Sequence, residues 1–203
     1  YPNISSQWYE EVATHGPYPT SEDFGSLSHL DVKKLHPIPE KDDNPYVDAF
    51  WKWWPELYQN LHTFRITGGE PLLNKNTFRV LEEINRNPRQ ELDLAINTNL
   101  CIPDKNFNHF IGLMTELNRK LNNVQVYTSI EAFKEKAEYI RYGLDYDKFW
   151  YNIDRLLLEI PGLQISFMCT YNALSVTSFT DFLKEINNRR FELPVQSTGT
   201  TPQ

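Results

Sequence analysis

A glycine pair followed by a glutamate and a proline, Gly68-Gly69-Glu70-Pro71, comes directly after the apolar, β-branched run "HTFRIT". Glycines let the backbone take positive φ or approach a ligand closely, so that peptide groups can bind directly. The carboxylate of Glu70 can accept hydrogen bonds from an ammonium group. A tight turn with an exposed acid is the plain alternative. The preceding strand pattern and the amphipathic helix pattern that follows favour a ligand-binding loop.

Small or polar residues follow three further strand-like segments in the same way. The candidates are Asn97 and Asn99 in "NTNL", Ser129 and Glu131 in "SIEA", and Asn172 in "MCTYN". In parallel β/α proteins, ligands bind at the carboxyl ends of the strands. We therefore expect these side chains to lie around one site with the glycine-glutamate loop.

The elements that must position these residues alternate along the chain. The patterns predict strands over 62–67, 91–97, 123–130 and 163–170, with a weaker strand over 191–197. Apolar residues at helical spacing predict helices over 76–86, 110–121, 149–160 and 179–186. This order predicts an α/β fold in which helices cover a parallel sheet, either open or curved into a barrel.

Residues 1–60 are less regular and rich in proline. Two short helices fit there, one over 4–15 and one over 47–61 that is kinked or restarted at Pro55. Aromatic side chains of the second helix are expected to pack against the exterior of the barrel rather than on a ligand; they are Trp51, Trp53, Trp54 and Tyr58.

Composition narrows the class of protein. The 203 residues carry a formal net charge of -7, so no general basic field exists to attract nucleic acid, and we expect no bulk nucleic-acid partner. No apolar stretch approaches the roughly 18 residues that a membrane span needs, so no membrane partner is expected and a cytoplasmic location is favoured. Cys101 and Cys169 are too far apart in sequence for a metal-ligand motif, and we interpret them as reduced thiols.

The stretch "TGGEP" resembles the glycine-glycine-glutamate-proline motif of radical S-adenosylmethionine (SAM) enzymes, and the likeness continues over 61–198. The resemblance implies a partial (β/α)6 TIM-like barrel that binds SAM, with Gly68, Gly69, Glu70 and Pro71 at its methionine end. It also implies cofactor contacts for the other candidates: Asn97, Asn99, Ser129, Glu131, Asn172, and Arg141 in "YIRYG". Arg141 matches a basic residue that pairs with the methionine carboxylate, a task for which a guanidinium fork is suited.

Members of that family hold a 4Fe-4S cluster through three cysteines in a Cys-x3-Cys-x2-Cys loop, and this sequence contains no such loop. The motif strand is the family's second strand, so we expect the first strand and the cluster ligands upstream of Tyr1. The resulting division is a helical, proline-rich segment over 1–60, a radical SAM core over 61–198 and a tail over 199–203.

The segment "EAFKEKAEYIRYGLDYDKFWYNI" is similar to branches whose core is followed by a twitch or SPASM extension. The implied reaction is reductive cleavage of SAM to a 5′-deoxyadenosyl radical that removes hydrogen from a substrate. The implied partners are a small-molecule or peptide substrate and a reductant such as flavodoxin or ferredoxin.

Two other functions stay open from the sequence. The chain could be a cluster-free, non-catalytic scaffold that binds SAM or another protein. It could also be an ordinary β/α-barrel enzyme that uses Glu70 as an acid or base. The histidines share no loop or spacing that would give Glu70 a partner for the latter; they are His15, His29, His36, His62 and His109.

Overall fold

A computed structural model describes residues 14–16 and 43–192 of the chain. The chain divides into two compact units, Tyr1–Leu61 and His62–Gln203. Of the helix expected over 4–15, the structure describes only Thr14 and His15, which are helical. The rest of that prediction lies outside the described residues.

In the first unit, helix α3 (Pro45–Asn60) confirms the second predicted helix. It begins where the Asn44 side chain accepts a hydrogen bond from the Tyr46 amide at 3.0 Å, with Pro45 in the first turn, where its missing N–H has no cost. Pro55 lies inside one helix, so the helix does not restart there. The rings of Trp54 and Tyr58 stack 5.0 Å apart, and both side chains are buried.

The second unit is built on a parallel sheet. Its strands are β1 (Thr63–Ile66), β2 (Asp93–Thr98), β3 (Asn123–Ser129) and β4 (Gln164–Met168), in the order β1-β2-β3-β4. The register places Asn97 beside Tyr127 and Tyr127 beside Ser166. All four strands predicted over 62–170 are therefore confirmed.

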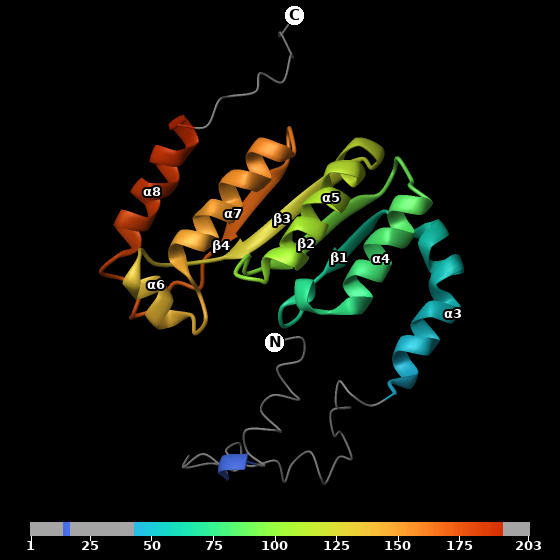
Figure 1. Ribbon diagram of the computed structural model, residues 1–203, viewed down its shortest axis with the longest axis horizontal. Helices are drawn as coiled ribbons and strands as arrows, with labels where there is room; N and C mark the ends of the chain where they lie inside the picture. The colour runs from blue at the N-terminus through green and yellow to red at the C-terminus, as the bar shows by residue number, and fades with distance from the viewer. Residues whose placement is uncertain (1–13, 17–42, 193–203) are drawn as a thin grey trace, which may run out of the picture. The chain divides into compact units, whose positions relative to one another are not determined.

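Helices connect and flank the strands. They are η2 (Pro71–Leu73), α4 (Lys75–Arg86), α5 (Asp104–Lys120), α6 (Glu135–Ile140), α7 (Tyr146–Glu159) and α8 (Phe179–Glu192). Figure 1 shows α4, α5 and α7 side by side over one face of the sheet. Right-handed crossovers between strands that are added in chain order place their helices on one face, as this sheet does.

The core lies between that helix layer and the sheet. The largest side chains there are fully buried, as with Phe110 of α5 and Phe149 of α7. Every second residue of the strands points toward these helices, including Ile96 and Val126. Because apolar residues are buried on this face, α4, α5 and α7 hold the strands and thus fix the loops at the strand ends.

The strand predicted over 191–197 is wrong at its first two residues, because helix α8 continues through Phe191 and Glu192. No glycine or proline interrupts the chain between Phe179 and Glu192, so nothing local stops the helix before the residues that lead to Pro194. The remainder of that predicted strand lies outside the described residues. The structure thus shows an α/β fold with a parallel sheet whose strands follow one another in chain order.

Candidate ligand-binding site at the strand ends

The glycine-glutamate loop follows β1 at its carboxyl end. Gly68 has φ +122°, a backbone conformation that residues with a Cβ rarely adopt, and no atom lies within 4 Å of where a Cβ would stand. The residue is exposed, and Gly69 is half-buried. The backbone, rather than packing, therefore requires glycine at position 68, and its peptide groups are open to a ligand.

Glu70, by contrast, is buried, with 2% of its surface exposed. Oε1 accepts hydrogen bonds from the Leu72 amide at 3.2 Å and the Thr98 hydroxyl at 2.7 Å. Oε2 accepts one from the Asn99 amide at 2.7 Å. The carboxylate caps η2, which Pro71 begins, and ties the loop after β1 to the end of β2. Three of its roughly four acceptor positions are thus used within the chain.

Burial acts on the ionisation of this carboxyl group. Desolvation raises the pKa of Glu70 above its ordinary value of 4.5, and the hydrogen bonds from Asn99, Thr98 and Leu72 oppose that rise. Burial thus disfavours the ionised form, and donors from the loop after β1 and from the end of β2 offset part of that effect. A ligand ammonium group at Oε2 would add a further stabilising contact.

The loop after β2 has an unusual backbone. Leu100 has φ +60° although it carries a fully buried side chain. Its amide donates to the Thr98 hydroxyl at 3.1 Å, and its carbonyl accepts from the buried Asn152 side chain at 2.7 Å. The Asn99 side chain accepts from the Cys101 amide at 2.9 Å. Left-handed backbone costs about 1–3 kcal/mol in such residues, so these bonds hold a strained turn beside Glu70.

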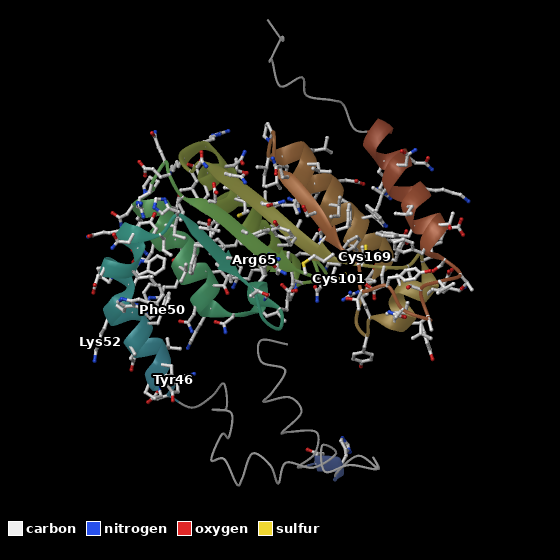
Figure 2. All side chains as sticks on the ribbon, turned by 180° about the vertical axis from the view of Figure 1, so that it is seen from behind. Tyr46, Phe50, Lys52, Arg65, Cys101 and Cys169 are labelled. Atoms are coloured by element: carbon white, nitrogen blue, oxygen red, sulfur yellow. The ribbon has the colours of Figure 1, made fainter. Side chains whose placement is uncertain are left out.

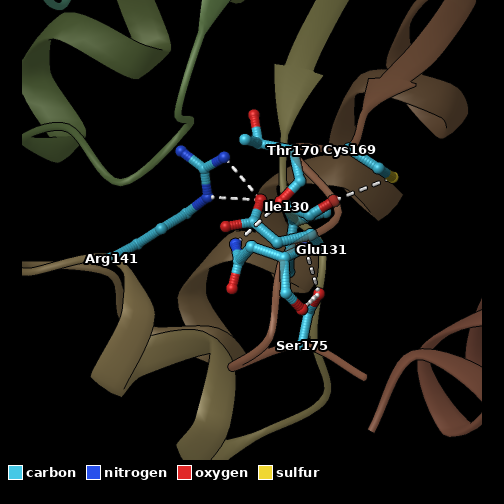
Figure 3. Close-up of polar contacts among 7 residues, drawn as sticks. Ile130, Glu131, Arg141, Cys169, Thr170 and Ser175 are labelled. Carbon is cyan, nitrogen blue, oxygen red and sulfur yellow. Dashed lines mark hydrogen bonds and ion pairs between the residues drawn. The ribbon is translucent and has the colours of Figure 1, made fainter. Parts of the chain in front are cut away.

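Glu131 and Arg141 form an ion pair after β3 (Figure 3). The Arg141 Nε and Nη2 donate to Glu131 Oε2 at 3.0 and 2.5 Å. Glu131 is buried with 3% of its side chain exposed, whereas 27% of the Arg141 side chain is exposed. Arg141 is therefore not a freely solvated charge. One carboxylate oxygen takes both donors, which fixes the guanidinium plane.

A hydrogen bond links the end of β4 to the end of β3, and the chain after β4 forms a local turn. The Cys169 thiol donates to the Ile130 carbonyl at 3.1 Å, as Figure 3 shows. The Asn172 side chain accepts from the Leu174 amide and donates to the Thr170 carbonyl. Both ends of that amide thus serve the local turn rather than the other candidates.

Asn97 lies on the sheet face that α4, α5 and α7 leave open. Its Oδ1 accepts from Arg65 Nε at 3.0 Å, and its Nδ2 lies 3.2 Å from the Met168 sulfur. Ser129 ends β3 on the same face, paired in register with Met168. Figure 2, turned to show that face, labels Arg65 on the strands.

The structure brings the candidates together in small groups at one end of the sheet. Glu70 meets Asn99, Glu131 meets Arg141, and Asn97 meets Arg65. Sequence reasoning did not assign Thr98 or Arg65. The strand period of two could have indicated both residues. It places Thr98 on the sheet face opposite to Asn97, and it places Arg65 on the face opposite to Phe64 and Ile66.

The donor set for an iron-sulfur cluster does not fit this chain. Such a cluster takes thiolate ligands, three of them in the motif described above, and the sequence contains two cysteines. Burial raises the pKa of Cys101 to about 11, which disfavours the thiolate. Desolvation also raises the pKa of Cys169. Among the described residues, no group of three or more His, Cys, Asp or Glu side chains could hold a metal ion.

Comparison with known proteins identifies no similar protein. The chain matches no protein-family model, no curated protein and no solved structure. The support for a function therefore comes from the site and from the sequence motif. Among the described helices, none has the length and apolarity to cross a membrane.

Proposed function

We propose that this chain is the SAM-binding β/α core of a radical SAM enzyme. The observation that carries the proposal is the loop after β1, where an exposed Gly68 with φ +122° stands next to a buried, firmly held Glu70. Glycine is needed there for the backbone and the space beside it is open, which is what binding by peptide groups requires. The proposed barrel is the (β/α)6 partial barrel of that family.

In this proposal the loops act as one receptor for the methionine end of SAM. The Gly68-Gly69 backbone approaches the amino group, and Glu70 orients that backbone through its bonds to Thr98 and Asn99. Glu70 acts chiefly as a positioning residue because three donors of the chain already occupy it. Arg141, fixed by Glu131, keeps an Nη1 group that can donate to a ligand carboxylate.

A cluster-binding set of three cysteines is not among these 203 residues, so the loops described above account for SAM binding and not for its reductive cleavage. The proposal places those cysteines in sequence preceding Tyr1, with the reductant, substrate and cytoplasmic location expected for the family. The twitch or SPASM extension that the resemblance implies is likewise a proposal.

Calorimetric titration of the 203-residue chain with SAM tests the binding part of the proposal. Gly68→Ala forces a Cβ into a left-handed backbone and shifts the loop, so we expect SAM affinity to fall about tenfold, the equivalent of about 1.4 kcal/mol. Gly162→Ala is the matched control. Gly162 also has positive φ and open space, but it lies before β4 at the opposite end of the sheet.

Equal SAM affinity of the two glycine variants and the parent would contradict the assigned site. Undetectable SAM binding by the folded parent chain, with a retained far-ultraviolet circular dichroism spectrum, would favour the form of the scaffold function in which the chain binds another protein. The third function, with Glu70 as a general acid or base, is disfavoured by its burial and by its three donors.

A further inference from the structure

The sheet face that α4, α5 and α7 leave open carries polar side chains. The strands of a parallel sheet that is covered on both faces are continuous apolar runs, whereas apolar and polar residues alternate along these strands. The residues that share the open face by register include Arg65, Asn97, Gln125, Tyr127, Ser166 and Met168. They are connected: Tyr127 donates to Gln125 at 2.8 Å, and Gln125 donates to Ser166 at 2.8 Å. The side chains of this face are therefore suited to contact with water or with a polar ligand.

Arg65 is held in one orientation on this face. Its Nε donates to Asn97 Oδ1 at 3.0 Å, and its guanidinium carbon lies 4.1 Å from the centre of the Tyr127 ring. Nη2 lies 3.7 Å from the Met168 sulfur, which is a weak acceptor. The side chain is exposed. Stacking and one hydrogen bond therefore position the guanidinium while its outer N–H groups keep donor capacity.

The charge of Arg65 is not balanced by a carboxylate in the part of the chain that the structure describes. Arg141, Arg155 and Arg189 each form an ion pair with an acidic side chain. Arg65 instead contacts an amide, a thioether and an aromatic ring. In a chain of net charge -7, a cation fixed by neutral partners is a local site of positive potential.

We propose that Arg65 binds an oxyanion, a carboxylate or a phosphate, of a ligand that lies on the open sheet face. The guanidinium fork offers two parallel donors to such a group, and the Asn97 amide, which now donates to the Met168 sulfur, offers a third. Arg65 comes three residues before Gly68, at the same end of β1. Naming this ligand as the substrate of the reaction rests on the proposed function; oxyanion binding itself does not.

Nuclear magnetic resonance of the 15N-labelled chain tests the site with two probes, sodium acetate and sodium phosphate, at constant ionic strength set with sodium chloride. We expect saturable shifts of the Arg65 Nε–H and Asn97 side-chain amide signals with at least one probe. A response to acetate alone indicates a carboxylate ligand, and a response to phosphate alone indicates a phosphorylated one. Either result supports the site.

Arg65→Gln is expected to weaken this binding about tenfold or more, because a charge-assisted bidentate contact is lost. Arg65→Lys keeps the positive charge but lacks the guanidinium fork, so its affinity for the probe should lie between those of the parent and Arg65→Gln. Arg155→Gln is the control, because Arg155 is paired with Glu159 on α7. The proposal is overturned by linear, non-saturating shifts with both probes, or by the same Asn97 response in folded Arg65→Gln protein. Neither outcome depends on whether SAM binds.

Discussion

The ionisation of Glu70 is a consequence of its place in the structure. Because burial raises its pKa above 4.5, the folded chain binds a proton more tightly there than the unfolded chain does. The contribution of this group to stability is therefore fully present below pH 4.5. It is lost as the pH rises through the raised folded pKa.

Glu70→Gln removes this titration. We expect the stability advantage of the parent over Glu70→Gln to shrink as the pH rises from about 4.5, the ordinary pKa, and then to level off. At every pH the amide turns an N–H group toward a buried donor, which costs about 1–3 kcal/mol. Urea unfolding over a pH series measures both effects, with the exposed Glu135→Gln as control. An advantage that grows with rising pH would mean that the ionised carboxylate is the favoured form.

At the scale of single residues, the sequence indicates the backbone need for a glycine but not which side chains become hydrogen-bond partners. Glycine at position 68 was predictable from its type, because positive φ is a property of the residue itself. That Glu70 binds Thr98 and Asn99 depends on which strands are neighbours. The alternative of an exposed acid is wrong for the same reason: burial is set by the fold, not by the four residues of the motif.

The strands differ in how firmly the structure holds them. β2 and β3 each pair on both sides and contribute buried residues, whereas no residue of β4 is buried. We expect β4 amides to exchange with solvent faster than those of β3, because local opening needs less free energy where few apolar contacts are lost. Hydrogen exchange read by mass spectrometry measures this order. Equal protection of β3 and β4 would show that another part of the protein covers β4.

Elements with a regular apolar period were predictable and short irregular ones were not. The pattern of Phe110, Met114 and Leu117 specified α5 because three buried side chains recur at helical spacing. The six-residue α6 and the three-residue η2 have no such repeat, and they depend on loop contacts. The continuation of α8 is not evident from the sequence because Pro194 fits an interrupted strand and the end of a helix equally well.

In the whole molecule, the order of the strands decides which face of the sheet is open. Strands in chain order with helices on one face leave the other face uncovered by α4, α5 and α7, and this face bears the fixed cation Arg65 close in sequence to the glycine-glutamate loop. Alternation along the chain was enough to predict the parallel sheet. The polar network across the four strands depends on their register, which the strand patterns leave undetermined.

The formation of 5′-deoxyadenosine tests the proposed radical SAM function most directly. The complete product of the reading frame that encodes this chain is reconstituted anaerobically with iron and sulfide, reduced with dithionite and incubated with SAM, and the nucleoside is measured by mass spectrometry. We predict 5′-deoxyadenosine from the parent and from Gly162→Ala, and at least about tenfold less from Gly68→Ala. A folded, iron-loaded protein that releases none, or equal amounts from both glycine variants, would contradict the proposal.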